Sequence, residues 1–260
     1  MGRKKSSAAA EPAEYAIEPT NWLELTEECH HYEGRHEVPW DIQKYSIFSL
    51  YDEGICMTDD AWFGVTPEPI AHKIVEELPS NDSLRIVIDV FCGAGGNSIA
   101  FALSDNWDRV ISIERDAATL ACAQNNAEVY GVDPEKITWI HGDSFDFMDK
   151  LLNSPEQLHP DLRIDLDATL LFASPPWGGP GYSTDEVFNL DNMQPYSLDK
   201  LHQAYKRLDH VLFLPRTSDL RQLAKLAPKD EKIDIVQYCM QGASKALVAY
   251  IPGVGASAES

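Results

Sequence analysis

The chain has 260 residues, of which 44% are hydrophobic and 24% are charged, a composition typical of one large globular domain. It carries 42 acidic and 21 basic residues. The resulting formal net charge of −21 argues against a protein that coats nucleic acid, because such binding depends on Lys and Arg. No apolar run approaches the ~18 residues of a membrane span, and the N-terminus lacks the apolar stretch of a secretory signal. We therefore expect an intracellular protein that binds no membrane.

The charge is uneven along the chain. From Lys200 to Lys232 there are eight Lys or Arg residues against four Asp or Glu residues. A chain of this kind can still hold a short, specific piece of RNA by stacking and a few local cations. The alternative is that the charge serves solubility alone.

The cysteines predict neither a disulfide framework nor a zinc ribbon. Their number is odd, their spacing is scattered and no C-x-x-C motif occurs. The five are Cys29, Cys56, Cys92, Cys122 and Cys239. Cys29, His30 and His31, with His36, form the one cluster that resembles metal ligands, and a polar loop is the favoured interpretation there. We expect no bound metal.

Composition and pattern divide the chain into four parts. We expect a flexible tail over 1–35, a helical appendage over 36–66, an α/β domain over 67–252 and a short tail over 253–260. In the appendage, Tyr45 and Phe48 lie on one helical face, which predicts a short helix over 42–50. The next helix begins with Thr66 as N-cap and Pro67 at the first position, and it continues to about Leu78.

A regular alternation of strands and helices follows. Apolar runs separated by amphipathic helices predict a doubly wound, mostly parallel, Rossmann-like sheet, closed by a C-terminal antiparallel hairpin. The predicted strands are 85–91, 109–114, 137–141, 168–173, 210–214, 233–240 and 245–251. The predicted helices between them are 97–103, 117–130, 145–152, 198–207 and 219–226.

A glycine-rich loop follows the first strand and predicts a nucleoside site. The loop consists of Cys92, Gly93, Ala94, Gly95, Gly96 and Asn97. Ligands in such folds bind outside the carboxyl ends of the strands, and glycines let the backbone approach them closely. A dinucleotide motif would have a third glycine where this chain has Ser98.

Three acidic residues near the ends of the first three strands indicate which nucleoside derivative binds. Asp89 precedes the loop and suits a cationic amine, Glu114 can accept ribose hydroxyls, and Asp143 can meet an adenine amine. An amine, a ribose and an adenine together point to S-adenosylmethionine. The alternative is that the three carboxylates only cap strand ends.

The segment after the fourth strand predicts a second binding site. Ser174, Pro175, Pro176 and Trp177 form a rigid turn in which prolines remove N–H donors and expose carbonyls. Together with the flat face of Trp177, these acceptors can hold the exocyclic amine of a planar base beside a methyl donor. The alternative is a rigid turn whose Trp177 packs in the core.

Several motifs carry a family resemblance. Asp89-x-Phe91-x-Gly93-x-Gly95 resembles class I S-adenosylmethionine-dependent methyltransferases, and Ser174-Pro-Pro-Trp177 resembles the Asn/Asp-Pro-Pro-aromatic motif of enzymes that methylate base amines. The strings VIDVFCGAGGNSIAFAL, NNAEVYG, SPPWGGPGY and FLPR, preceded by DAWFGVTPE, are similar to the trimethylguanosine synthase family of RNA cap hypermethylases. The resemblance covers about Trp40 to Ile251. It implies the successive addition of two methyl groups to the exocyclic N2 of a 7-methylguanosine cap on small nuclear and nucleolar RNAs.

The resemblance also implies roles for individual residues. The cofactor-binding set is Phe63, Thr66, Asp89, Cys92, Gly93, Ala94, Gly95, Asn97, Glu114 and Asp143, with Phe63 and Thr66 closing over the cofactor. The set that presents the cap is Lys44, Phe48, Asp60, Trp177 and Arg216. Within it, Trp177 stacks on the methylated guanine, Phe48 and Asp60 complete the base pocket, and Arg216 with Lys44 meets the cap phosphates. Ser174 and Pro175 orient the accepting nitrogen.

The family implies partners and a location as well. We expect a 7-methylguanosine-capped small RNA as substrate, components of RNA–protein particles as further partners, and a monomeric enzyme. The expected location is the nucleus, including the nucleolus, with some protein in the cytoplasm. Two alternatives stay open: a methyltransferase acting on an internal guanine or adenine, and a non-catalytic cap-binding module.

Overall fold

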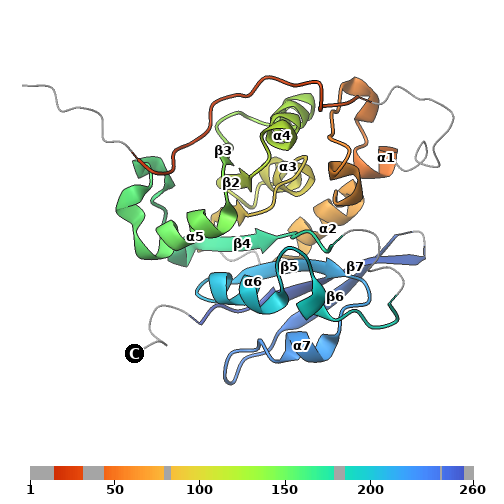
Figure 1. Cartoon of the computed structure of the whole chain (residues 1–260), viewed down its shortest axis with the longest axis vertical. Helices are drawn as coiled ribbons and strands as arrows, with labels where there is room; N and C mark the ends of the chain where they lie inside the picture. Colours follow the sequence, from red (N-terminus) through yellow and green to blue (C-terminus); the bar gives the residue numbers. More distant parts are fainter. Residues whose placement is uncertain (1–14, 32–43, 79–82, 179–184, 241, 255–260) are drawn as a thin grey trace, which may run out of the picture.

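The computed structural model describes residues 15–31, 44–78, 83–178, 185–240 and 242–254, without the side chain of Phe63. In these ranges a central sheet lies between two layers of helices (Figure 1). None of the helices in these ranges is both long enough and apolar enough to cross a membrane.

Seven strands form one sheet in the order β3-β2-β1-β4-β5-β7-β6. The neighbours among β1 to β5 are parallel, and β7 is antiparallel to both β5 and β6. The bounds are β1 Ile86–Asp89, β2 Arg109–Glu114, β3 Ile137–His141, β4 Thr169–Ala173, β5 His210–Pro215, β6 Asp234–Met240 and β7 Ala243–Ile251. This arrangement confirms the predicted doubly wound, mostly parallel sheet with a C-terminal antiparallel hairpin.

Helices cover both faces of the sheet, which explains why its parallel strands are largely apolar. Val87, Phe172 and Val211 contribute to a core shared with α1, α2 and α3. Their sequence neighbours Ile88 and Leu171 contribute to a core shared with α5, α6 and α7 on the opposite face. The bounds are α1 Lys44–Ile47, α2 Glu68–Glu77, α3 Gly96–Leu103, α4 Ala117–Val129, α5 Ser144–Asn153, α6 Leu198–Tyr205 and α7 Leu220–Ala224.

Two local predictions in the N-terminal half differ from the structure. The helix predicted over 42–50 ends earlier in the structure, because α1 stops at Ile47. A separate 3₁₀ turn, Tyr51–Glu53, follows and ends at Gly54, whose φ is 105°. Thr66 is not the N-cap of α2, since Pro67 takes that position. The Thr66 hydroxyl instead accepts a hydrogen bond from Asn97 Nδ2 at 3.0 Å.

Residues 15–31, which the sequence places in a flexible tail, lie along the molecule in the structure. We call them the N-terminal segment; Figure 1 shows it passing β3 and α4 on its way to the region of α1. Thr20 N donates to Trp139 O at 2.8 Å, and His141 N donates to Thr20 Oγ1 at 2.7 Å. Because β3 is the edge strand of the sheet, these bonds satisfy backbone groups that no neighbouring strand reaches. Backbone pairing of this kind leaves no apolar periodicity in the sequence.

Candidate active site

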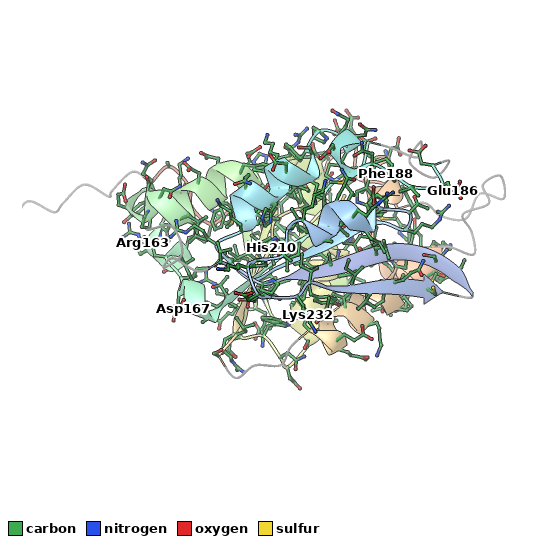
Figure 2. All side chains as sticks on the ribbon, turned by 90° about the horizontal axis from the view of Figure 1, so that it is seen from below. Arg163, Asp167, Glu186, Phe188, His210 and Lys232 are labelled. Atoms are coloured by element: carbon green, nitrogen blue, oxygen red, sulfur yellow. The ribbon has the colours of Figure 1, made fainter. Side chains whose placement is uncertain are left out.

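Five of the predicted site residues lie at or just after the carboxyl ends of the parallel strands. Asp89 ends β1 and Glu114 ends β2, while Asp143, Ser174 and Arg216 follow β3, β4 and β5. Figure 2 shows this end of the molecule through Glu186 and Phe188, opposite the end that carries Arg163 and Asp167. Phe188 marks the carboxyl edge because its N–H donates to the carbonyl of Thr217, just after β5, at 2.7 Å.

Asp89 has the properties of a site for a cation. Its side chain is fully buried, and Oδ2 accepts a hydrogen bond from Ser98 Oγ at 2.7 Å. Oδ1 has no hydrogen-bond partner by geometry in the described part of the chain, although the Ser98 hydroxyl and the nearby backbone of Phe91 favour the charged form of the carboxyl group. Burial raises the pKa of Asp89 to about 7. A buried carboxylate oxygen without a partner is unfavourable, and a cationic ligand would relieve it.

The glycine loop after β1 needs glycine at two positions. Gly93 has φ +53° and Gly95 has φ +92°, a region that other residues rarely adopt. A Cβ on Gly95 would also lie 3.2 Å from both Cα and Cβ of Ala123 on α4. The loop therefore packs directly on α4, and its backbone is held beside the end of β1. The neighbouring Cys92 is buried, and this burial raises the pKa of its thiol.

Glu114 is already engaged by the backbone around it. Oε1 accepts from the N–H groups of Arg115 at 2.9 Å and Asp116 at 3.0 Å, and Oε2 accepts from Gly93 N at 3.1 Å. Burial raises the pKa of Glu114. A carboxylate has about four acceptor positions, so capacity for a ligand hydroxyl remains mainly at Oε2.

Asp143 acts as a helix cap in this structure. Its Oδ1 accepts from Phe145 N at 2.8 Å and Asp146 N at 3.2 Å, at the start of α5. The side chain is exposed. Capping occupies Oδ1, so a ligand amine would meet Oδ2.

The turn after β4 presents one ring and several carbonyls. Pro175 is buried, whereas Ser174 and Trp177 are partly exposed. Trp177 Nε1 donates to Phe213 O at 3.3 Å, and the two rings stack at 5.7 Å between centroids with 18° between their planes. The structure thus supports part of the core-packing interpretation of Trp177, because the ring packs on Phe213 while the residue stays partly exposed at the carboxyl edge.

Residues predicted to complete the cap pocket lie in the region of α1 and the turns after it. Phe48 is only 2% exposed and packs on Tyr130, 6.0 Å between centroids, so a base could reach only a small part of its ring. Lys44 Nζ lies 3.3 Å from Asp52 Oδ1. Asp60 is exposed at the start of a 3₁₀ turn. The Phe63 side chain lies outside what the structure describes.

The Cys29-His30-His31 cluster does not gather into a metal site. Within the described ranges, no three His, Cys, Asp or Glu side chains are placed to hold a metal ion. His31 Nδ1 instead lies 2.8 Å from Ile55 O, and its ring stacks on Tyr51. His36 lies outside the described residues.

Sequence reasoning missed Asn126, a fully buried side chain on α4 that bonds both the glycine loop and residue 56. It belongs to the string NNAEVYG, which carried the resemblance without a role for any of its residues. A run of three amide side chains, 124–126, in a helix rich in Ala is the signal that could have revealed it.

Comparisons with known proteins show the family of this chain. A family model described as RNA cap guanine-N2 methyltransferase matches residues 84–254. The chain is 36% identical over 217 residues to a trimethylguanosine synthase of Schizosaccharomyces pombe, an alignment that covers 83% of this chain and 85% of that protein. It is 35% identical over 188 residues to a trimethylguanosine synthase of Saccharomyces cerevisiae, covering 70% of this chain and 56% of the relative.

Solved structures share the fold at low sequence identity. A putative methyltransferase from Porphyromonas gingivalis W83 superposes with a TM-score of 0.58 at 13% identity, covering 87% of this chain and 53% of that one. The methyltransferase domain of METTL16 superposes with a TM-score of 0.50 at 14% identity, covering 79% of this chain and 92% of that one. These likenesses confirm the predicted Rossmann-like fold.

Proposed function

From the membership of this chain in the RNA cap guanine-N2 methyltransferase family, we propose that it adds two methyl groups in succession to N2 of a 7-methylguanosine RNA cap, giving 2,2,7-trimethylguanosine. The observation that carries the proposal is the pairing of two features at one edge of the sheet. The buried Asp89 carboxylate, with its unpartnered Oδ1, suits the cationic end of a methyl donor. The Ser174–Trp177 turn beside it suits a planar base with an exocyclic amine.

The cofactor is S-adenosylmethionine, whose sulfonium supplies an already activated methyl group. Asp89 would hold its ammonium, Glu114 its ribose and Asp143 its adenine amine. The backbone of Gly93 and Gly95 would lie against it, because these two residues carry no side chain. These roles follow from the positions of the residues at the ends of β1, β2 and β3.

The main task of the protein is to align the accepting nitrogen with the methyl group. Positioning of this kind lowers a reaction barrier by several kcal/mol without any acid or base. The Ser174 hydroxyl and the Pro175 carbonyl would accept hydrogen bonds from the amine and favour a more tetrahedral nitrogen. Its proton leaves to solvent after transfer, so Asp60 orients the base and does not act as a strong general base.

Trp177 would recognise the N7-methylated base. Methylation at N7 makes guanine cationic, and a cation over a tryptophan face gains about 0.5–2 kcal/mol. The Phe213 ring and carbonyl hold Trp177 in place, which reduces the side-chain entropy lost when the base binds.

The RNA would enter with its phosphates toward Arg216 and Lys44. The basic run from Lys200 to Lys232 begins in α6 and ends after α7, and it would offer further contacts to a short RNA segment. We infer a small capped RNA as substrate, RNA–protein particle components as partners, a monomeric enzyme and a nuclear location that includes the nucleolus.

Mass spectrometry of a 7-methylguanosine cap dinucleotide incubated with enzyme and S-adenosylmethionine tests the proposal. One and then two added methyl groups on the guanine N2 are the expected products. Equal methylation of uncapped RNA would instead favour an internal base as target. Cap binding without any transfer, in the presence of bound cofactor, would favour a non-catalytic cap-binding module.

A further inference from the structure

Three consecutive side chains of α4 form hydrogen bonds to other segments of the chain. Gln124, Asn125 and Asn126 carry amides, and Gln124 and Asn126 are fully buried. Gln124 binds the N-terminal segment, accepting from Leu23 N at 2.8 Å and donating to Asn21 O at 3.2 Å. Such amides are unusual on a buried helix face, where an unsatisfied amide would cost stability.

Asn126 connects two parts of the candidate site. Its Oδ1 accepts from Cys56 N at 2.8 Å, and its Nδ2 donates to Cys56 O at 2.8 Å. The same Nδ2 donates to Ala94 O in the glycine loop at 3.0 Å. One short side chain that both donates twice and accepts has to be asparagine, because aspartate cannot donate in its charged form and glutamine is longer.

A second buried asparagine joins the same two parts of the chain. Asn97, at the start of α3, donates to Thr66 Oγ1 at 3.0 Å. Between these ties the backbones approach closely, since a Cβ on Gly96 would lie 3.4 Å from Val65 Cγ1 and 3.5 Å from Thr66 O. The loop 93–97 and the segment 56–66 are therefore held together at both ends.

We propose that Asn126 is a positioning residue that couples the cofactor loop to the cap-facing segment 56–66, so that ordering of either part by its ligand orders the other. This inference rests on the proposed function, in which the loop meets S-adenosylmethionine and the segment faces the cap. Coupling of this kind is reciprocal: each ligand tightens the binding of the other by the same factor.

Calorimetric titrations of S-adenosylhomocysteine and a 7-methylguanosine triphosphate cap analogue, each with and without the other, test the coupling. Asn126→Ala is compared with wild type and with Gln124→Met, a matched variant that loses bonds from the same helix but leaves the loop untouched. We expect wild type and Gln124→Met to show the same mutual tightening. Asn126→Ala should reduce that factor, with the Asn97–Thr66 bond still in place, and weaken cofactor binding about tenfold, which corresponds to about 1.4 kcal/mol. Mutual tightening that is as large in Asn126→Ala as in wild type, or is absent from wild type, would overturn the inference.

Hydrogen exchange on wild-type protein gives a test that does not depend on a variant folding. S-adenosylhomocysteine should slow exchange of the Cys56 N–H, whose acceptor is Asn126 Oδ1, as well as exchange within the glycine loop. Protection confined to the loop would refute the coupling. Failure of both ligands to bind would refute the proposed function instead, so the two outcomes are distinguishable.

Discussion

Asp89 should make the ligand-free protein less stable as the pH rises. Its pKa is 3.8 as a free side chain and about 7 in the folded protein, because burial disfavours the charged form. Between about pH 4 and pH 7 the folded state therefore binds more protons than the unfolded state, so the free energy of unfolding falls as pH increases. The full difference corresponds to about 4 kcal/mol above pH 7.

Asp89→Asn removes this pH dependence while preserving the shape of the side chain. The amide oxygen can still accept from Ser98 Oγ. Without a buried charge, the ligand-free variant should be more stable than wild type at pH 8 by up to about 4 kcal/mol. Denaturant unfolding of both proteins at several pH values between about 5 and 8 measures the difference. Parallel pH profiles for the two proteins would show that Asp89 is not the buried acid we infer.

The same carboxylate should make cofactor binding tighter as the pH rises, whereas it makes the ligand-free fold less stable. An ammonium group favours charged Asp89, so binding of S-adenosylmethionine at pH 7 should release about half a proton. Affinity should fall as the pH drops below 7, and Asp89→Asn should lose most of it. Calorimetry in two buffers of different ionisation enthalpy counts the proton. A cofactor that binds without proton release, and equally well to the variant, would contradict the assignment of Asp89 to the ammonium.

Three further substitutions test other parts of the site. Trp177→Ala should lose nearly all cap methylation while keeping cofactor affinity, and Trp177→Phe should keep part of the activity. Calorimetry with cap analogues that carry or lack the N7 methyl group checks the reason. Equal binding of both analogues to wild type would count against stacking on a cationic ring. Arg216→Ala should weaken binding of a triphosphate cap by about 1.5–3 kcal/mol and leave 7-methylguanosine nucleoside nearly unaffected. Equal losses in calorimetric affinity for both would mean that Arg216 is structural. Gly95→Ala should lower the free energy of unfolding by about 1–3 kcal/mol, because Gly95 has a positive φ and an added Cβ would lie 3.2 Å from Ala123. Denaturant unfolding measures the change, and unchanged stability would show that the loop adapts.

The parts that the sequence predicted well are those in which pattern and packing agree. Strands buried on both faces, such as Thr169–Ala173 and His210–Pro215, are continuous apolar runs and were predicted to within a residue. The carboxyl edge of a parallel sheet follows from strand order alone, so the positions of Asp89 and Glu114 could also be predicted.

The parts that the sequence did not predict depend on polar contacts between distant segments. The N-terminal segment is held mainly through its backbone N–H and C=O groups, which composition does not reveal. Asn126 bonds residues 32 and 70 positions away, and nothing in its local pattern specifies those partners. Phe48 was expected at the ligand surface, but tertiary packing against Tyr130 encloses it, since an aromatic residue at helical spacing can face either a ligand or the core.

The position of Thr20 beside β3 has a consequence for the limits of the folding unit. The family match begins at residue 84, yet the hydrogen bonds of the last strand on that side are completed by residues more than sixty positions earlier. A shortened protein that began after residue 31 would expose the carbonyl of Trp139 and the N–H of His141 to solvent. Open strand edges recruit other strands, including those of identical molecules. We therefore expect a chain shortened in this way to self-associate more readily, so that catalytic activity measured on it would include the effects of this exposed edge.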